Sequence, residues 1–127
     1  MYLIDTNILI YHFADQIPAH AQETMDNIFK THFHISVITK IEFLGWQKIS
    51  DKQLKKAKDF LDFATIIPLN KPVVDRTIKI KQTHNIRLPD AVIAATALSK
   101  KMILVTRNAA DFKGIKVKIY NPFEGKT

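Results

Sequence analysis

The sequence predicts an α/β fold, a three-layer sandwich in which a short central parallel sheet is flanked by helices. Three observations lead to this class: β-like runs alternate with helical stretches, residues 102–105 are wholly apolar, and no repeat or linker interrupts the order. Wholly apolar runs are typical of strands buried on both faces, and strands alternating with helices build a parallel sheet. We therefore expect residues 1–127 to form one domain.

Local patterns predict each element in turn. The clearest helix has Leu54, Ala57 and Leu61 at helical spacing among lysines. Asn70 is a typical cap residue, and Pro89 stands where the first helical residue is favoured. The expected strands are residues 2–4, 34–37, 66–67, 102–105 and 116–120, and the expected helices are residues 7–14, 19–29, 39–49, 51–63, 70–84 and 90–101.

Composition excludes several classes of protein. No apolar run approaches the roughly 20 residues that a membrane-spanning helix needs. Asp5 interrupts the stretch that a signal peptide would keep apolar. The absence of cysteine excludes disulfides and thiolate zinc sites, so we expect a cytoplasmic protein without membrane contact.

The charge is positive and uneven. The net charge is +7, and most of the Lys and Arg residues follow position 65. A basic half suggests a polyanionic partner, either nucleic acid or an acidic membrane surface. The alternative is that lysines only keep a small domain soluble. The basic residues expected to guide a polyanion are Lys71, Arg76, Lys79, Lys81 and Arg87.

Acidic residues stand where strands end or the following helices begin. Asp5 directly follows the first strand and Asp90 opens the Ala-rich helix, although both positions also suit helix capping or the helix dipole. Glu42 is expected beside a buried arc of isoleucines that includes Ile41, although an exposed ion pair with a lysine is an alternative. Thr106 and Asp111 follow another strand, where they are also ordinary loop residues.

The topology brings these acids to one edge, because the carboxyl ends of parallel strands lie together. Clustered carboxylates repel each other unless a hard cation lies between them, and oxygen ligands without cysteine favour Mg²⁺ or Mn²⁺. No Gly-rich phosphate loop occurs. We interpret all the histidines as structural or surface residues; they are His12, His20, His32, His34 and His84.

Several motifs, in this order and spacing, resemble PIN domains and are most similar to the VapC-type toxins of toxin–antitoxin systems. They are LIDTN at residues 3–7, Glu42, LPDAVIAATA at residues 88–97, LVTRN at residues 104–108, Asp111-Phe112 and YNPF at residues 120–123. The resemblance therefore spans nearly the whole chain. It implies a PIN-like fold and nuclease activity.

The resemblance also implies roles for individual residues. Family members often place their fourth acid close to the position of Asn108, where this chain has an amide, so we assign that role to Asp111. This departure puts a strict two-metal mechanism in doubt. The expected catalytic acids are Asp5, Glu42, Asp90 and Asp111, with Asp5, Asp90 and Asp111 as metal ligands. The expected supporting residues are Thr6, Asn7, Thr106 and Asn108, and the expected phosphate-binding residues are Arg87 and Arg107.

These features predict a Mg²⁺-dependent endoribonuclease, the toxin of a type II toxin–antitoxin pair, with RNA as substrate and an antitoxin and a second copy as partners. Apolar residues on the helices at 19–29 and 51–63 are expected to supply part of a partner surface; they are Ala21, Met25, Ile28, Phe29, Phe60 and Phe63. One alternative is a degenerate PIN-like module that binds RNA or protein without cleavage. Another is an aspartyl phosphotransferase, which usually has a second acid two residues after the first, where this chain has Asn7.

Overall fold

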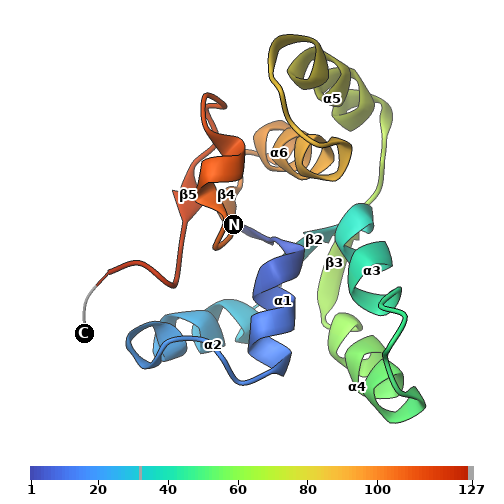
Figure 1. Cartoon of the computed structure of the whole chain (residues 1–127), viewed down its shortest axis with the longest axis vertical. Coiled ribbons are helices and arrows are strands. Elements are labelled where there is room, and N and C mark those ends of the chain that lie inside the picture. The colour runs from blue at the N-terminus through green and yellow to red at the C-terminus, as the bar shows by residue number, and fades with distance from the viewer. Residues whose placement is uncertain (32, 126–127) are drawn as a thin grey trace.

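A computed structural model describes residues 1–31 and 33–125 and confirms the predicted α/β sandwich. All strand pairs are parallel, and the sheet has the order β3-β2-β1-β4-β5 (Figure 1). The strands are β1 (Tyr2–Ile4), β2 (Phe33–Ser36), β3 (Ala64–Ile67), β4 (Ile103–Val105) and β5 (Ile119–Tyr120).

The helices begin at the residues that local sequence favours. Ser50 and Gln53 form a reciprocal capping box, and the Asn70 side chain accepts a hydrogen bond from the Val73 N–H, as a cap does. The α-helices are α1 (Thr6–Phe13), α2 (Gln22–Lys30), α3 (Val37–Leu44), α4 (Asp51–Leu61), α5 (Lys71–Thr83) and α6 (Leu88–Lys100). Two 3-10 turns are η1 (Ala19–Ala21) and η2 (Ala109–Phe112).

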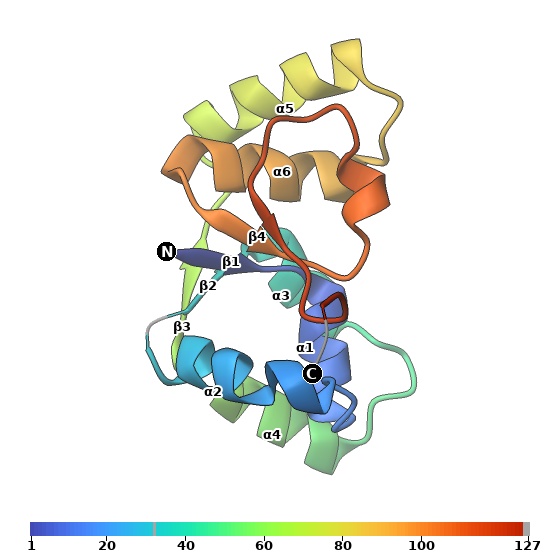
Figure 2. The same cartoon turned by 90° about the vertical axis from the view of Figure 1, so that its left-hand side faces the viewer.

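Two hydrophobic cores lie on opposite faces of the sheet. Successive strand residues point to opposite faces, so Leu3 joins the core with α5 and α6 while Ile4 joins the core with α1, α2 and α4. Figure 2 shows α5 and α6 on one side of the sheet and α1, α2 and α4 on the other. Ala91, Ala94 and Ala95 are fully buried, and their small side chains let α6 pack closely between the sheet and α5.

The strand order places a switch point between β1 and β4. From β1 the chain moves outward through β2 to β3, then returns to β4 on the other side of β1. In open parallel sheets, ligands bind at the carboxyl ends of the strands beside such a switch. Asp5 follows β1 and Thr106 follows β4, so both lie at this position.

The third helix is shorter than predicted. It ends at Leu44, and the Gly45 N–H bonds the Ile41 carbonyl oxygen at 2.8 Å. A Cβ at residue 45 would lie 2.5 Å from that same oxygen, so this turn requires glycine. The buried arc predicted from a longer helix is also wrong at Ile41, which is 63% exposed, because Thr39 and Phe43 form the buried face.

The partner surface predicted on the second and fourth helices is mostly core. Met25 and Ile28 are buried beneath the sheet, and Phe63 is the exposed member of that set. Large apolar side chains are exposed elsewhere, on α3 and α5 and in the loop that follows α3. The prediction for His32 lies outside the described residues. Within the described ranges, no helix combines the length and the apolar character needed to cross a bilayer.

Candidate active site

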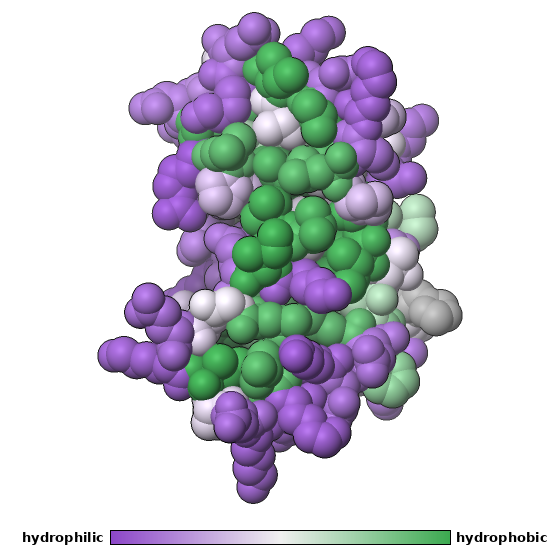
Figure 3. Space-filling view, turned by 90° about the vertical axis from the view of Figure 1, so that its right-hand side faces the viewer, coloured by the Kyte–Doolittle hydropathy of each residue, from purple (hydrophilic) through white to green (hydrophobic). Residues whose placement is uncertain are grey.

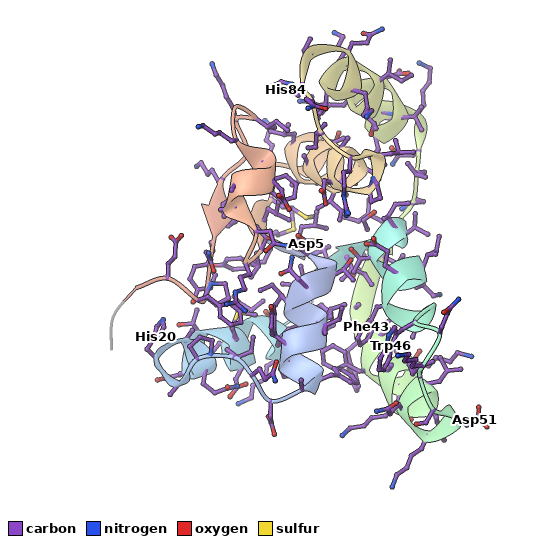
Figure 4. The ribbon with its side chains drawn as sticks, in the orientation of Figure 1. Asp5, His20, Phe43, Trp46, Asp51 and His84 are labelled. Carbon is purple, nitrogen blue, oxygen red and sulfur yellow. The ribbon has the colours of Figure 1, made fainter. Side chains whose placement is uncertain are left out.

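Asp5 is the most buried acid of the site, with 5% of its surface exposed. It caps α1, and its Oδ1 accepts a hydrogen bond from the Thr6 N–H at 2.8 Å. Its Oδ2 accepts from the Asn7 side-chain amide at 3.0 Å and from the Thr106 hydroxyl at 2.8 Å. Both carboxylate oxygens are therefore held in fixed directions. Figure 4 shows Asp5 near the centre of the molecule, where α1 begins.

Glu42 reaches the same region from α3. The Thr6 hydroxyl donates to Glu42 Oε1 at 2.7 Å and lies 3.2 Å from the Thr39 hydroxyl. Thr6 thus links Asp5 to Glu42, since its backbone bonds one acid and its side chain bonds the other. Thr39 is fully buried in this contact and was missed by the sequence analysis, because a lone threonine in a helix carries no distinctive pattern.

The loop after β4 joins the site through Thr106, which is fully buried. Its hydroxyl donates to Asp5 and accepts from the Asn7 amide at 3.3 Å and from the Asn108 N–H at 3.1 Å. The Arg107 N–H donates to Asn7 Oδ1 at 3.1 Å. The structure therefore places Thr106 and Asn7 against Asp5, and the Asn108 backbone against Thr106.

Asp90 lies in the first turn of α6, with 14% of its side chain exposed. Arg87 Nε lies 3.4 Å from Asp90 Oδ2, while the Arg87 side chain remains 77% exposed. Asp111 belongs to the 3-10 turn after the β4 loop and is exposed. Asp90 interacts electrostatically with both Asp111 and Glu42.

Electrostatics show that these acids form one cluster. Burial raises the pKa of Asp5 above 3.8, and the neighbouring charges of Asp90 and Glu42 raise it further, although hydrogen bonds from Thr106 and Thr6 oppose the shift. Burial also raises the pKa of Asp90, with Asp111 and Glu42 adding to the increase and Arg87 opposing it. The carboxylates repel one another, and a cation among them would relieve that repulsion.

The donor set fits a hard divalent cation. The groups facing one another are carboxylate and hydroxyl oxygens, which Mg²⁺ and Mn²⁺ prefer. Within residues 1–31 and 33–125, no group of three or more His, Asp or Glu side chains is arranged so that it could hold a metal ion. The chemistry of the donors and the repulsion among the acids are what would suit such a cation.

Arg107 has contacts that the sequence did not predict. Its guanidinium carbon lies 4.9 Å from the Tyr11 ring centroid and 4.4 Å from that of Phe123. Asn121 donates from its side chain to the Arg107 carbonyl at 3.1 Å. The sequence did contain a signal for these contacts, the YNPF segment at residues 120–123. That segment was among the motifs that resemble PIN domains, but no role was assigned to it.

A groove of about 600 Å³ adjoins the acidic cluster. Glu42 lines one part of it, and α1, α3, α4 and the loop between α3 and α4 form the walls. The walls are largely apolar, with Ile10, Phe13, Phe43 and Trp46 among the lining residues. Ile10 is 53% exposed and Trp46 is 56% exposed. Figure 4 shows Trp46 beside Phe43 at the end of α3.

Comparisons with known proteins agree with this geometry. The profile of the PIN domain family matches residues 2–118. No curated protein sequence matches the chain. A chain in a toxin–antitoxin complex from Klebsiella pneumoniae is 31% identical, with a TM-score of 0.80 over 98% of this chain and 99% of that one.

Two further solved structures share the fold. FitAcB from Neisseria gonorrhoeae is 23% identical, with a TM-score of 0.80 over 97% of this chain and 99% of that chain. DNA-bound VapBC from Salmonella typhimurium is 22% identical, with a TM-score of 0.81 over 95% of this chain and 97% of that chain.

Fold and site together define an α/β protein with an acidic site at the carboxyl edge of a parallel sheet. The chain belongs to the PIN domain family, and its structural neighbours are toxin–antitoxin complexes. PIN domains are generally nucleases, so the family supports a nuclease of the toxin type. The expected resemblance to VapC-type toxins is confirmed.

Proposed function

We propose that this protein is a metal-dependent endoribonuclease and the toxin of a type II toxin–antitoxin pair. The observation that carries the proposal is the electrostatic interaction of Asp90 with Asp5, Glu42 and Asp111, acids from separate parts of a chain whose net charge is +7. The basic surface favours a polyanion, and the acidic edge favours a divalent cation that would act on it.

The metal would be Mg²⁺ or Mn²⁺, held by Asp5, Asp90 and Asp111. When bound, it would lower the pKa of a water molecule and offset charge on the phosphate. Thr6, Asn7 and Thr106 hold Asp5 in a fixed orientation, and the Asn108 backbone extends that network.

Glu42 accepts from Thr6 and would orient the attacking water. Arg87 lies beside Asp90, and Arg107 is exposed in the loop that follows Thr106, so their N–H groups would bind the scissile or an adjacent phosphate. In-line attack would leave a 5′-phosphate and a 3′-hydroxyl, as the family resemblance implies.

An antitoxin is the proposed protein partner, because the structural neighbours were determined as complexes of toxin and antitoxin. The apolar groove beside Glu42 offers such a partner a concave surface next to the acids. A segment bound there would obstruct access to the site. Cytoplasmic RNA is the proposed substrate pool.

A second copy of the chain is proposed to pack on the apolar flank of α5, which we define as Val74 and Ile78 on the helix and Leu69 just before it. Leu69, Val74 and Ile78 are 45%, 38% and 50% exposed. Figure 3, which views the side where α3, α4 and α5 lie in Figure 1, shows apolar residues in a band across this face. Such a surface favours association in water. Light scattering should give a dimer mass for the wild type and a monomer mass for Ile78→Lys; a monomeric wild type would overturn this part.

A degenerate PIN module that binds RNA without cleaving it is the alternative function. The clustered acids disfavour it, because a site that only binds a polyanion gains nothing from repelling carboxylates. Incubating the protein with RNA and with a phosphomonoester, each with and without Mg²⁺, separates the possibilities. We expect the protein to cleave RNA but not the phosphomonoester, and to cleave RNA only when Mg²⁺ is present. Hydrolysis of the monoester alone would instead support phosphotransferase-like chemistry.

A further inference from the structure

The C-terminal segment, residues 120–125, folds back onto the loop that follows β4. The Thr106 N–H donates to the Tyr120 carbonyl at 3.1 Å, and the Asn121 side chain donates to the Arg107 carbonyl at 3.1 Å. Asn121 also accepts the Phe123 N–H at 2.9 Å. These bonds hold the segment, which includes the Phe123 ring, against the β4 loop.

That ring packs against the guanidinium of Arg107. The guanidinium carbon lies 4.4 Å from the Phe123 ring centroid and 4.9 Å from the Tyr11 ring centroid, and the two ring centroids are 4.8 Å apart. A cation at these distances is attracted by the electron-rich faces of aromatic rings. Arg107 is thus fastened by α1, where Tyr11 lies, and by the C-terminal segment.

The backbone of Arg107 carries this attachment to the acidic site. Its N–H donates to Asn7 Oδ1 at 3.1 Å, while Asn7 Nδ2 donates to Asp5 Oδ2 at 3.0 Å. The two ends of the Asn7 amide therefore have opposite partners. A flipped amide would turn its NH₂ towards the Arg107 N–H and its oxygen towards the Asp5 carboxylate, so both hydrogen bonds would become repulsive contacts.

We propose that Phe123, acting with Tyr11 and Arg107, is a positioning residue of the site: the C-terminal segment fixes the Asn7 amide and thereby the Asp5 carboxylate. This inference rests on the proposed function for its consequence in catalysis. Phe123 packs on Arg107 and Tyr11. Its effect reaches Asp5 through the Arg107 backbone and the Asn7 amide, and outer partners of this kind control how well a ligand group is oriented.

The test compares three variants with the wild type. Phe123→Leu removes the aromatic face and keeps apolar bulk, whereas Phe123→Tyr keeps the face and should rescue the function. Phe60→Leu is the matched control, because Phe60 is another partly buried phenylalanine packed against the same core, and its ring contacts are with His12, Phe13, Phe29 and Phe33.

Two measurements are made on each full-length protein. The first is Mn²⁺ affinity by electron paramagnetic resonance, where Phe123→Leu should raise the Kd about fivefold, since outer-partner changes usually weaken metal binding by roughly 10–100-fold and this one acts at one remove. The second is hydrogen exchange of the Asn7 side-chain amide by NMR, with its signals assigned by their loss in Asn7→Asp. Exchange should accelerate at least about fivefold in Phe123→Leu and stay unchanged in the other two variants.

The outcomes separate this inference from the proposed function. Equal Mn²⁺ affinity and equal amide exchange in Phe123→Leu and wild type would overturn the positioning role. Faster exchange in a protein that binds no Mn²⁺ in any form would support the positioning of Asn7 and overturn the metal site. If Phe123→Leu does not fold, Asn121→Ala removes the hydrogen bond to Arg107 instead, and the same two outcomes apply to it.

Discussion

The Asp5 carboxylate is held by opposing forces. It accepts three hydrogen bonds, which favour its charged form, yet burial and the neighbouring acids still raise its pKa. The pKa of Asp90 is also raised, because burial and the charges of Asp111 and Glu42 outweigh the opposing effect of the nearby Arg87. Burial and neighbouring charge therefore disfavour the charged forms of Asp5 and Asp90, a condition that a bound cation would relieve.

Asp5→Asn and Asp90→Asn should both reduce RNA cleavage by about 100-fold or more, on the scale of the lost metal affinity. Their effects on stability should differ. Asp90→Asn removes a repelled charge and should not lower the free energy of unfolding. Asp5→Asn replaces an acceptor with an NH₂ group, so at least one donor among Thr6, Asn7 and Thr106 loses its partner, at a cost of about 1–3 kcal/mol. Urea unfolding measures both, with Asp62→Asn as an exposed control; equal stabilities for the two variants would contradict the hydrogen-bond pattern.

The fourth acid is tested by Asp111→Ala and Asn108→Ala. Asp111 raises the pKa of Asp90 through its charge and is itself exposed. We therefore expect Asp111→Ala to reduce the cleavage rate by roughly tenfold, less than loss of Asp90. The Asn108 backbone, rather than its side chain, bonds Thr106. Asn108→Ala should accordingly have the smaller effect, and a larger loss in Asn108→Ala than in Asp111→Ala would show that the assignment is wrong.

His12 gives the fold a pH dependence. Its ring lies 4.4 Å from Phe29 and 5.4 Å from Phe60, measured between centroids, and burial lowers its pKa below 6.5 although Asp26 and Asp15 oppose this. Because the unfolded chain binds the proton more readily, the contribution of His12 to stability is complete above pH 6.5 and is lost as the pH falls towards its folded pKa. Thermal unfolding from pH 7.5 to 5 should show this loss in the wild type and a smaller one in His12→Phe. Parallel curves would rule it out.

At the scale of single elements, the residues that cap helices were predictable from the sequence. The buried face of a helix and the residue at which it ends were harder to predict. Asn70 caps α5 as its residue type indicates, since capping depends on a few adjacent atoms. The end of α3 at Gly45 depended on a contact with the Ile41 carbonyl, which helical periodicity does not report. The loop that begins there brings Trp46 to the wall of the groove.

The basic flank of α5 is also clearer in the structure than in the sequence. The Lys81 ammonium donates to the Ile86 carbonyl at 2.6 Å, and Lys71 pairs with Asp75 at 2.6 Å, so these two lysines already have partners. Arg76 and Lys79 are exposed and lie about 60° apart around the helix, on one flank. They are the better candidates for contact with RNA.

Arg76→Glu with Lys79→Glu should weaken RNA binding and reduce its dependence on salt by about two units of slope, since each neutralised phosphate releases counterions. Mn²⁺ affinity should stay unchanged, because neither residue is proposed to hold the metal. Binding across a salt series decides this, with Lys55→Glu and Lys58→Glu on α4 as a control of equal charge change. Identical slopes for the α5 variant and the wild type would place the RNA path elsewhere, along Lys100, Lys101 and Arg107.

At the scale of the whole molecule, the class of fold and the approach of Asp5 to Thr106 followed from the order of strands and helices. Parallel strands share a carboxyl edge, so Asp5 and Thr106 had to approach one another once β1 and β4 paired. Contacts between side chains from distant parts of the sequence, which no local pattern links, were not predictable. Phe123 reaches Arg107 because the chain folds back after β5, and no local pattern encodes that return. The exposure of the apolar flank of α5 was likewise not predictable from the sequence, because exposure depends on which neighbours cover a helix.

Metal-dependent cleavage of RNA is the central claim, and one measurement tests it most directly. RNA is incubated with wild type and Asp90→Asn, each with Mg²⁺, with Mn²⁺ and with excess EDTA, and the ends of the products are determined. We predict cleavage by the wild type with either metal, products that carry 5′-phosphates, and no cleavage in EDTA or by Asp90→Asn. Full activity of the wild type in EDTA, or equal activity of Asp90→Asn, would contradict the metal site at the carboxyl edge of the sheet.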